Sequence, residues 1–300
     1  MIWNNIIQRI IFFLLNVPGV VGNILVFVRH VYAFLTGPDK KPIDLIIIHL
    51  MFSNAVIICT LGLRDIATVF DFRNFVDNVG CKLLIYLVRV ARGLSICTTC
   101  LLSMIQAITI SPRTTLWRKL KPQTAWQVLP YLLLFWIINS LISSNLLHYI
   151  TAVNTLNGSG TEMYIGYCYM LPSRQEIRWF FLSLMALRDV IFQSLMGWSS
   201  GYMAFHLYKH HKRVLYLHSS RFANNSSPEI RATLSTLNLM TCFLVFYWAD
   251  FMFSVYTGST LRDDLITLNI KTFLDLGYAV LSPLVLINRD VRIAKFWRAH

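Results

Sequence analysis

Charged side chains are scarce in this 300-residue chain, and acidic ones are the scarcest. Only 14% of the residues are charged, whereas an average soluble domain has about 25%. Asp and Glu together number 14, against 27 Lys and Arg, while hydrophobic residues make up 56% of the chain. So little charge and so much apolar surface argue against a soluble globular protein.

Motifs of catalysis and cofactor binding are also missing. There is no phosphate-binding loop, zinc-protease motif, heme attachment signature or lipase nucleophile elbow. His206, His210 and His211 have helical metal-ligand spacing, but they lie among Lys and Arg, as at the solvated end of a membrane span. Cys97 and Cys100 are spaced like a redox pair, but within an apolar stretch where small residues pack between helices. We expect no catalytic residue, metal, cofactor or nucleic-acid partner.

Apolar stretches of membrane-spanning length recur from end to end. A helix needs about 20 predominantly apolar residues to cross a bilayer. Charged residues weaken the hydropathy signal of the third, fifth, sixth and seventh stretches. No segment between the stretches has the length of a separate soluble domain. The sequence therefore predicts an all-α membrane protein surrounded by lipid, with a single seven-helix domain over residues 1–300. The expected spans are about 10–28, 43–63, 83–110, 126–149, 179–205, 235–256 and 265–287.

Basic residues alternate between the two sides of this bundle. Sixteen Lys and Arg residues follow the first, third and fifth spans or lie in the C-terminal tail, and seven lie on the other side. Cytoplasmic loops carry the excess of basic residues, so we expect the amino terminus outside and the carboxyl terminus in the cytoplasm. The first span is too long for a cleaved signal peptide and no small-residue cleavage site follows it, which favours a membrane helix.

Two features of the second outer loop follow from this orientation. Asn157 begins a glycosylation acceptor triplet there, whereas the triplet at Asn225 lies in a cytoplasmic loop. Cys81 at the outer start of the third span and Cys168 in the loop both face an oxidising compartment. We expect a disulfide between them, because each is the other's only outer partner; the alternative is two free thiols.

Apart from Asp44 at the inner edge of the second span, seven charged residues lie inside four of the spans, in the outer half or near the midplane. A charge in a membrane is costly, so each needs a partner or a water-filled cavity. One interpretation is a structural ion-pair network that only fixes helix positions. The other is an outward-facing pocket for a small ligand, and the two are compatible. The pocket is assigned to Arg89, Arg92, Asp189, Asp250, Lys271 and Asp275, and Arg188 completes the charged set.

The inner half of the spans holds uncharged polar residues instead. Such residues hydrogen-bond between membrane helices at about 0.6 kcal/mol per bond. Pro283 removes a backbone hydrogen bond from the seventh span and should bend it. Weak contacts and a proline suit helices that shift between two packings. We hypothesise a switch that includes Gln106, Tyr278 and Pro283.

Local sequence resembles a known receptor family. Residues 80–112 read GCKLLIYLVRVARGLSICTTCLLSMIQAITISP and closely resemble the third-helix signature of the vomeronasal type-1 receptors. Further matches are TGPDKKPIDLIIIHLMFSN near the second span, RDVIFQSLMGWSSGYM in the fifth and YAVLSPLVLINRD in the seventh. Together the matches cover most of residues 20–292. The acidic-Arg-aromatic and Asn-Pro motifs of rhodopsin-like receptors are missing, so their activation switch is not transferred residue by residue.

The resemblance implies a multi-pass plasma-membrane receptor. It would bind pheromone-like small molecules and activate an inhibitory-type G protein through segments 111–122 and 206–231. By the same likeness, the outer-helix positions of the pocket are Arg89, Arg92, Asp189, Asp250 and Lys271. A bitter-taste-type receptor is the nearest alternative. If the chain were a transporter, we would expect broken helices in paired halves. The sequence does not exclude an ion channel or a scramblase.

Overall fold

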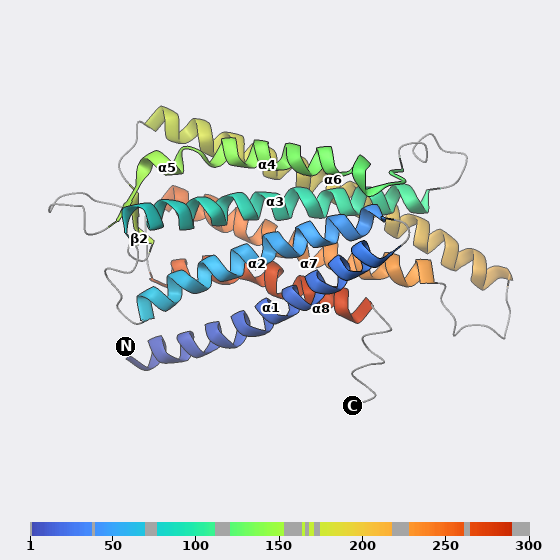
Figure 1. Ribbon diagram of the computed structural model, residues 1–300, viewed down its shortest axis with the longest axis horizontal. Coiled ribbons are helices and arrows are strands. Elements are labelled where there is room, and N and C mark those ends of the chain that lie inside the picture. Colours follow the sequence, from blue (N-terminus) through green and yellow to red (C-terminus); the bar gives the residue numbers. More distant parts are fainter. Residues whose placement is uncertain are drawn as a thin grey trace.

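The structure is a bundle of long helices that run side by side (Figure 1). This computed structural model describes residues 2–37, 40–69, 77–111, 121–152, 164–165, 168–170, 175–217, 228–260 and 265–289. The long helices are α1 (Ile2–Thr36), α2 (Pro42–Val69), α3 (Asn78–Ile110), α4 (Leu129–Ser143), α6 (Gln175–Leu217), α7 (Pro228–Thr260) and α8 (Leu265–Arg289). The short elements are η2 (Ala125–Gln127), α5 (Leu146–Tyr149), β1 (Ile150–Ala152), β2 (Tyr164–Ile165) and β3 (Cys168–Met170).

Six of the seven predicted spans each lie within one long helix, and most of these helices extend beyond the apolar stretch. The fourth span is a correction: residues 126–149 do not form one helix. Helix α4 ends at Ser143, and the Ser144 hydroxyl donates to the Leu141 carbonyl at 2.8 Å. The Ser144 backbone N–H bonds the same carbonyl at 3.2 Å, one residue short of the α-helical partner. Serine competes in this way for backbone groups, and the α-helical bonding pattern is interrupted here.

Several helices are long and apolar enough to cross a membrane. In the described part of the chain these segments are Asn16–Thr36, Pro42–Leu63, Asn78–Ile110, Ala125–Ser143 and Trp179–Lys209. Helices α7 and α8 contribute the shorter apolar segments Leu237–Phe253 and Leu276–Ile287. Large apolar side chains also cover the outside of the bundle, with Trp198 of α6 79% exposed and Leu14 of α1 67% exposed. Contact between such large apolar side chains and water is unfavourable, so an outer surface of this kind indicates a lipid environment.

Helix α3 lies at the centre of the bundle. It contacts α2, α4, α5, α6, α7 and β1. Every residue from Val90 to Cys100 is buried except the partly exposed Arg92. Many of these residues are small, which lets neighbouring helices approach closely. The helix begins at the N-cap Asp77, whose side chain accepts a hydrogen bond from the Gly80 N–H at 2.7 Å and satisfies an otherwise unpaired donor.

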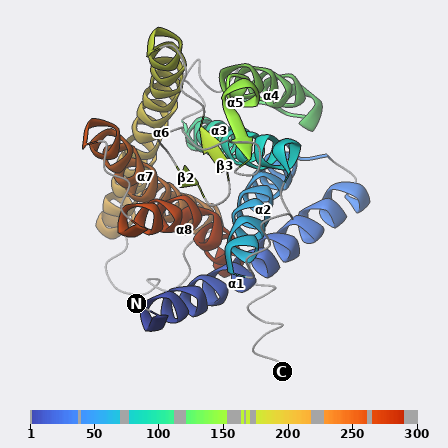
Figure 2. The ribbon, with the colours of Figure 1, turned by 90° about the vertical axis from the view of Figure 1, so that its left-hand side faces the viewer.

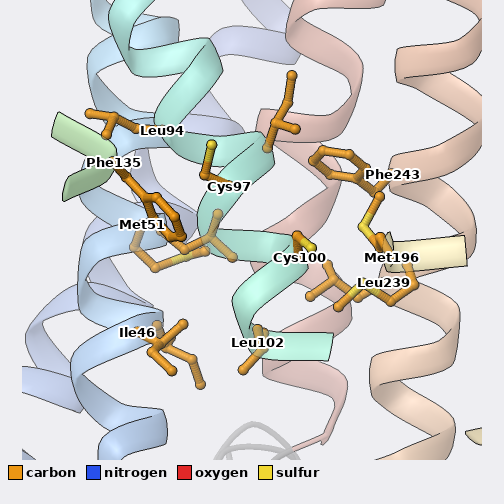
Figure 3. Close-up of a cluster of buried hydrophobic side chains, with 14 of the residues drawn as sticks. Ile46, Met51, Leu94, Cys97, Cys100, Leu102, Phe135, Met196, Leu239 and Phe243 are labelled. Atoms are coloured by element: carbon orange, nitrogen blue, oxygen red, sulfur yellow. The ribbon is translucent and has the colours of Figure 1, made fainter. Parts of the chain in front are cut away.

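The main hydrophobic core surrounds the middle of α3 (Figure 3). Cys97 and Cys100 are both buried free thiols in this core, in agreement with their interpretation as packing residues. They lie among apolar side chains from five helices, including Ile46, Met51, Leu94, Leu102, Phe135, Met196, Leu239 and Phe243. Interlocked side chains of this kind fix the positions of the polar groups described below.

A small antiparallel sheet crosses one end of the bundle (Figure 2). Its strand order is β1-β3-β2, and Cys168 of β3 is opposite Ala152 of β1 and Ile165 of β2. Strand β1 contacts α3, which begins at this end. We call it the sheet end of the bundle. The strands are an addition to the sequence prediction, which contained only helices and loops.

Candidate functional site

An ion pair connects α3 and α7 in the sheet-end half of the bundle. Arg92 Nη2 of α3 donates to Asp250 Oδ2 of α7. The Asp250 side chain is only 2% exposed, and that of Arg92 is 20% exposed. The Arg92 guanidinium also lies 5.2 Å from the ring centre of Tyr247, one turn from Asp250, in a cation–π contact. The other carboxylate oxygen, Asp250 Oδ1, is buried without a hydrogen-bond partner in the described part of the chain.

A second ion pair joins adjacent residues of α6 and reaches α4. Arg188 Nε and Nη2 both donate to Asp189 Oδ1, at 2.9 and 2.7 Å. Arg188 Nη1 donates to Asn139 Oδ1 of α4 at 2.7 Å, and both residues are buried. The Asn139 amide nitrogen donates to the Phe135 carbonyl at 2.8 Å, which aims its oxygen at the guanidinium. The guanidinium therefore links α6 to α4.

Gly93 provides the space in which α3, α4 and α6 meet. A Cβ atom at this position would overlap Asn139 Oδ1 and Arg188 Nη1. The Arg188–Asn139 hydrogen bond therefore requires a residue without a side chain at position 93. Neither Gly93 nor Asn139 was assigned to the site from the sequence. Asn139 could have been found, because a polar amide inside an apolar span needs a partner.

Arg89 lies one turn from Gly93 on the sheet-end side. It is within electrostatic range of Arg188, Arg92 and Asp189. Its side chain is partly buried, and its guanidinium forms no hydrogen bond or ion pair with the residues that the structure describes. The structure thus brings together four of the six pocket residues expected from the sequence, namely Arg89, Arg92, Asp189 and Asp250.

The other expected site residues are only partly described. Lys271 and Asp275 lie on α8, and their side chains are outside the described residues, as are Asn157 and the side chain of Cys168. Cys81 is fully buried near the start of α3 and packs with Leu146 of α5 and Ile150 of β1.

A chain of uncharged hydrogen bonds ties α2 to α3 and α4. Trp136 Nε1 of α4 donates to His49 Nε2 of α2 at 2.9 Å. That nitrogen is therefore an acceptor, so the other ring nitrogen of a neutral His49 carries the proton and donates to Thr98 Oγ1, also at 2.9 Å. The switch assigned from the sequence includes none of His49, Trp136 and Thr98. A charged His49 would lose the bond to Trp136.

A second polar chain joins α2, α3 and α8. Asn54 Nδ2 donates to Ser282 Oγ at 2.8 Å, and Asn54 Oδ1 accepts from Ser95 Oγ at 2.9 Å. The Tyr278 and Thr99 hydroxyls are 3.0 Å apart. All five residues are buried. Of the remaining switch candidates, Gln106 is 7% exposed, and its buried Oε1 has no partner in the described part of the chain.

Pro283 has a specific effect on the contact between α8 and α1. A proline has no N–H, so the carbonyl four residues earlier, that of Ala279, loses its helical donor. Asn23 of α1 takes its place and donates to the Ala279 carbonyl at 2.9 Å. The proline ring also packs on α1, since a Cβ at Gly22 would meet the Pro283 ring at 3.1 Å. Pro283 thus converts a backbone hydrogen bond within one helix into a contact between two helices.

The fold and the polar site define a helical membrane protein with an ionic cluster at one end and a neutral polar network beyond it. Among known proteins, the chain matches the family described as the vomeronasal organ pheromone receptor family over residues 6–299. It is 33% identical to mouse vomeronasal type-1 receptor 40 over 281 residues, which are 94% of this chain and 90% of the relative. It is 33% identical to rat vomeronasal type-1 receptor 90 over 296 residues, covering 97% and 94% of the two chains. Human vomeronasal type-1 receptor 4 is 32% identical over 281 residues, covering 94% and 93%.

The chain therefore belongs to the family of vomeronasal type-1 receptors. It is a chemosensory G-protein-coupled receptor and a multi-pass protein of the plasma membrane. Its relatives are receptors and not enzymes.

Proposed function

We propose that this receptor binds a small pheromone-like ligand between α3, α6 and α7 at the sheet end, and in response activates an inhibitory-type G protein. The ionic cluster is the observation that carries the proposal. Charges inside a membrane cost at least about 2.5–3.5 kcal/mol each and tend to mark binding sites. Asp250 Oδ1 is a buried acceptor without a partner among the described residues, and a ligand donor would satisfy it.

The cluster also offers a way to sense the ligand. The ion pair Arg92–Asp250 ties α3 to α7, and the Arg188–Asn139 bond ties α6 to α4. A ligand that competes for any of these groups changes the relative free energies of two helix arrangements. The proposed pocket residues on α8 are Lys271 and Asp275.

The domain is proposed to be a single bundle of seven spans with the sheet end outside the cell. The supports are the alternating basic loops and the apolar segments of α7 and α8, which continue the series of membrane-capable helices. This orientation exposes Asn157 to the glycosylation enzymes and keeps Asn225 away from them.

Glycosylation tests the orientation directly. We expect the receptor expressed in mammalian cells to carry a glycan that an endoglycosidase removes, with a shift of one glycan on a gel. Asn157→Gln should abolish the shift, and the control Asn225→Gln should leave it unchanged. A glycan at Asn225 instead would reverse the proposed topology.

A disulfide between Cys81 and Cys168 is proposed to hold the second outer loop against α3. Of the six cysteines, Cys59, Cys97, Cys100 and Cys242 are free thiols, and Cys81 is not among them. Strand β3 begins with Cys168 and pairs with β1, which itself contacts α3. The two cysteines therefore belong to elements at the same end of the bundle.

Signal transfer is proposed to pass through the neutral polar network to the segments 111–122 and 206–231, which would meet the G protein. The polar contacts that include Tyr278 and Thr99 are weak individually, so they can exchange at low cost. Gln106, whose Oε1 has no hydrogen-bond partner among the described residues, would gain a hydrogen bond in a second state.

Pro283→Ala tests this route. The new N–H would compete with Asn23 for the Ala279 carbonyl, so the bond between α1 and α8 should weaken. We expect near-normal surface levels and about a threefold change in ligand response, since hydrogen bonds of this kind contribute about 0.6 kcal/mol on average. An unchanged concentration–response curve at equal surface expression would remove Pro283 from the switch.

The deciding experiment is a ligand screen on cells that display the receptor, read as inhibition of cAMP formation. Volatile and steroid-like compounds form the library. The proposal expects receptor-dependent inhibition that pertussis toxin blocks, because that toxin uncouples inhibitory-type G proteins. Ligand uptake without G-protein activation would indicate a transporter and overturn the proposal.

A further inference from the structure

A backbone hydrogen bond joins two loops at the end of the bundle opposite the sheet. The Ala125 N–H donates to the Lys40 carbonyl at 3.1 Å. Lys40 lies just before α2, and Ala125 begins η2, which contacts both α2 and α4 where these helices begin (Figure 1). Ala125 and Pro42, on either side of this bond, are buried. The bond therefore fixes Lys40 beside η2.

Exposed lysines gather along the two joined loops. They are Lys40, Lys41 and Lys121. The ion pairs of the described residues include none of the three. The Lys40 ammonium lies 4.9 Å from the ring centre of Phe34 near the end of α1, a contact that adds no negative charge. Of the described carboxylates, that of Asp44 in the first turn of α2 is already bonded to His30 at 2.9 Å.

An exposed tryptophan lies next to the lysines. Trp126 follows Ala125 in η2 and is 67% exposed. It stands at the beginning of the membrane-capable segment Ala125–Ser143, further along which apolar side chains such as Leu133 face outward. Tryptophan is enriched at the boundary between membrane and water, where its ring lies at the level of the lipid headgroups. Trp126 therefore places the lysines at headgroup level.

This combination fits an anionic lipid. Basic loops alone only orient a bundle in the membrane, but here a hydrogen bond holds one lysine beside an apolar ring at the membrane boundary. Clustered lysines at the cytoplasmic surface attract anionic headgroups, and ammonium groups bind phosphate oxygens through charge-assisted hydrogen bonds. A headgroup with several phosphates can engage more than one lysine, whereas phosphatidylserine offers a single net charge. The exposed ring favours a lipid over a soluble anion.

We propose that Lys40, Lys41 and Trp126 form a binding site for a phosphoinositide lipid of the cytoplasmic leaflet, with Lys121 at its edge. This inference goes beyond the proposed function and takes from it only the orientation of the bundle. The lysines bind the phosphates, and the Trp126 ring contacts the glycerol and the beginning of the acyl chains. Lys121 belongs to segment 111–122, which would meet the G protein, so the bound lipid restrains that segment.

Native mass spectrometry of the purified full-length receptor in detergent tests the site. The receptor is titrated with phosphatidylinositol 4,5-bisphosphate, with phosphatidylserine, and with soluble inositol 1,4,5-trisphosphate, and the Kd of each follows from the fraction bound. We expect the phosphoinositide to bind at least about 10-fold more tightly than phosphatidylserine, because each further lysine engaged contributes about fivefold. The soluble headgroup should bind more weakly than the lipid, because it makes no contact with the Trp126 ring.

Paired substitutions locate the site. In K40Q/K41Q the Kd of the phosphoinositide should rise about 10- to 30-fold. The matched control K209Q/K212Q removes the same charge from exposed lysines of α6 and should leave this Kd within about twofold. W126A should raise the Kd of the lipid about 3- to 10-fold without affecting the soluble headgroup, whereas W198A, at a 79% exposed tryptophan of α6, should change neither.

Three results would overturn the proposal. The first is equal affinity of wild-type receptor for phosphatidylserine and the phosphoinositide, which would indicate a general anionic surface and is decisive without any variant. The second is equal loss of binding in K40Q/K41Q and K209Q/K212Q, or in neither. The third is a soluble headgroup that binds as tightly as the lipid, which would assign the lysines to a free polyphosphate. No ligand or G protein takes part, so failure here leaves the receptor proposal intact, and a failed ligand screen leaves this site intact.

Discussion

Asp250→Asn is expected to abolish the ligand response and to lower the amount of receptor at the cell surface severely. Asp250 is 2% exposed and is the carboxylate partner of Arg92. The substitution preserves shape and removes only the charge of the buried carboxylate, so the partly exposed guanidinium of Arg92 loses its compensation from α7. Loss of one partner of a buried ion pair typically costs about 3–5 kcal/mol. A stability loss of that size is a large share of the total for many proteins.

The same substitution at Asp44 provides the control. Asp44 pairs with His30 at 2.9 Å, but both side chains are about one-fifth exposed, at 18% and 20%. The Asp44 carboxylate is reached by water, unlike that of Asp250, and a partly exposed contact of this kind contributes about 0–1 kcal/mol, so Asp44→Asn should leave the surface level near normal. Surface level is measured by antibody staining and thermal stability by unfolding of detergent-purified receptor. If both Asn variants behaved alike, the α3–α7 ion pair would not stabilise the bundle.

The double variant Arg92→Gln with Asp250→Asn separates stability from ligand binding. Removing both charges avoids an unpaired buried cation, so part of the surface expression should return. The ligand response should stay absent, because two charged residues of the proposed pocket are gone. Recovery of both properties would show that the pair has only a structural role.

The length of the apolar stretches and the composition were sufficient for the helical framework. The apolar stretches correspond to helices because a membrane leaves few other ways to satisfy backbone groups. The turn at Ser144 and the three short strands were missed, since they depend on local hydrogen bonds and on pairing between residues far apart in sequence. Helix ends were also misplaced, because the helices α1, α6 and α7 continue well past their apolar segments.

The site was predictable where a residue type was unusual for its surroundings. Arg92 and Asp250 are charges in apolar spans, and that contrast identified them. Which cation pairs with which anion could not be predicted, because it depends on helix rotation. Asn139 holds Arg188 although the two residues lie on different helices, and Gly93 matters only because these two side chains fill its space. Tertiary contacts of this kind have no local signature.

Cys81→Ser is expected to remove most of the receptor from the cell surface, as is Cys168→Ser. A cross-link that closes a long loop restricts the unfolded chain and stabilises the folded one by about 4 kcal/mol in entropic models. The proposed disulfide would also hold β3 near α3. Without it, the neighbouring pocket would lose its outer wall. Cys59→Ser is the control, because Cys59 is a free, exposed thiol.

The double variant Cys81→Ser with Cys168→Ser tests whether the two cysteines bond each other. If Cys81 and Cys168 bond each other, replacing both should lower surface expression no further than either single change, because the second substitution removes a sulfur that has already lost its partner. Additive losses would indicate two independent roles. Alkylation with a mass-tagged maleimide under denaturing, non-reducing conditions gives the direct count. Four thiols should react in the wild type and all six after reduction, since four cysteines are free in the structure. Six reactive thiols before reduction would exclude the disulfide, and the outer loop would then depend on the β1–β3 pairing alone.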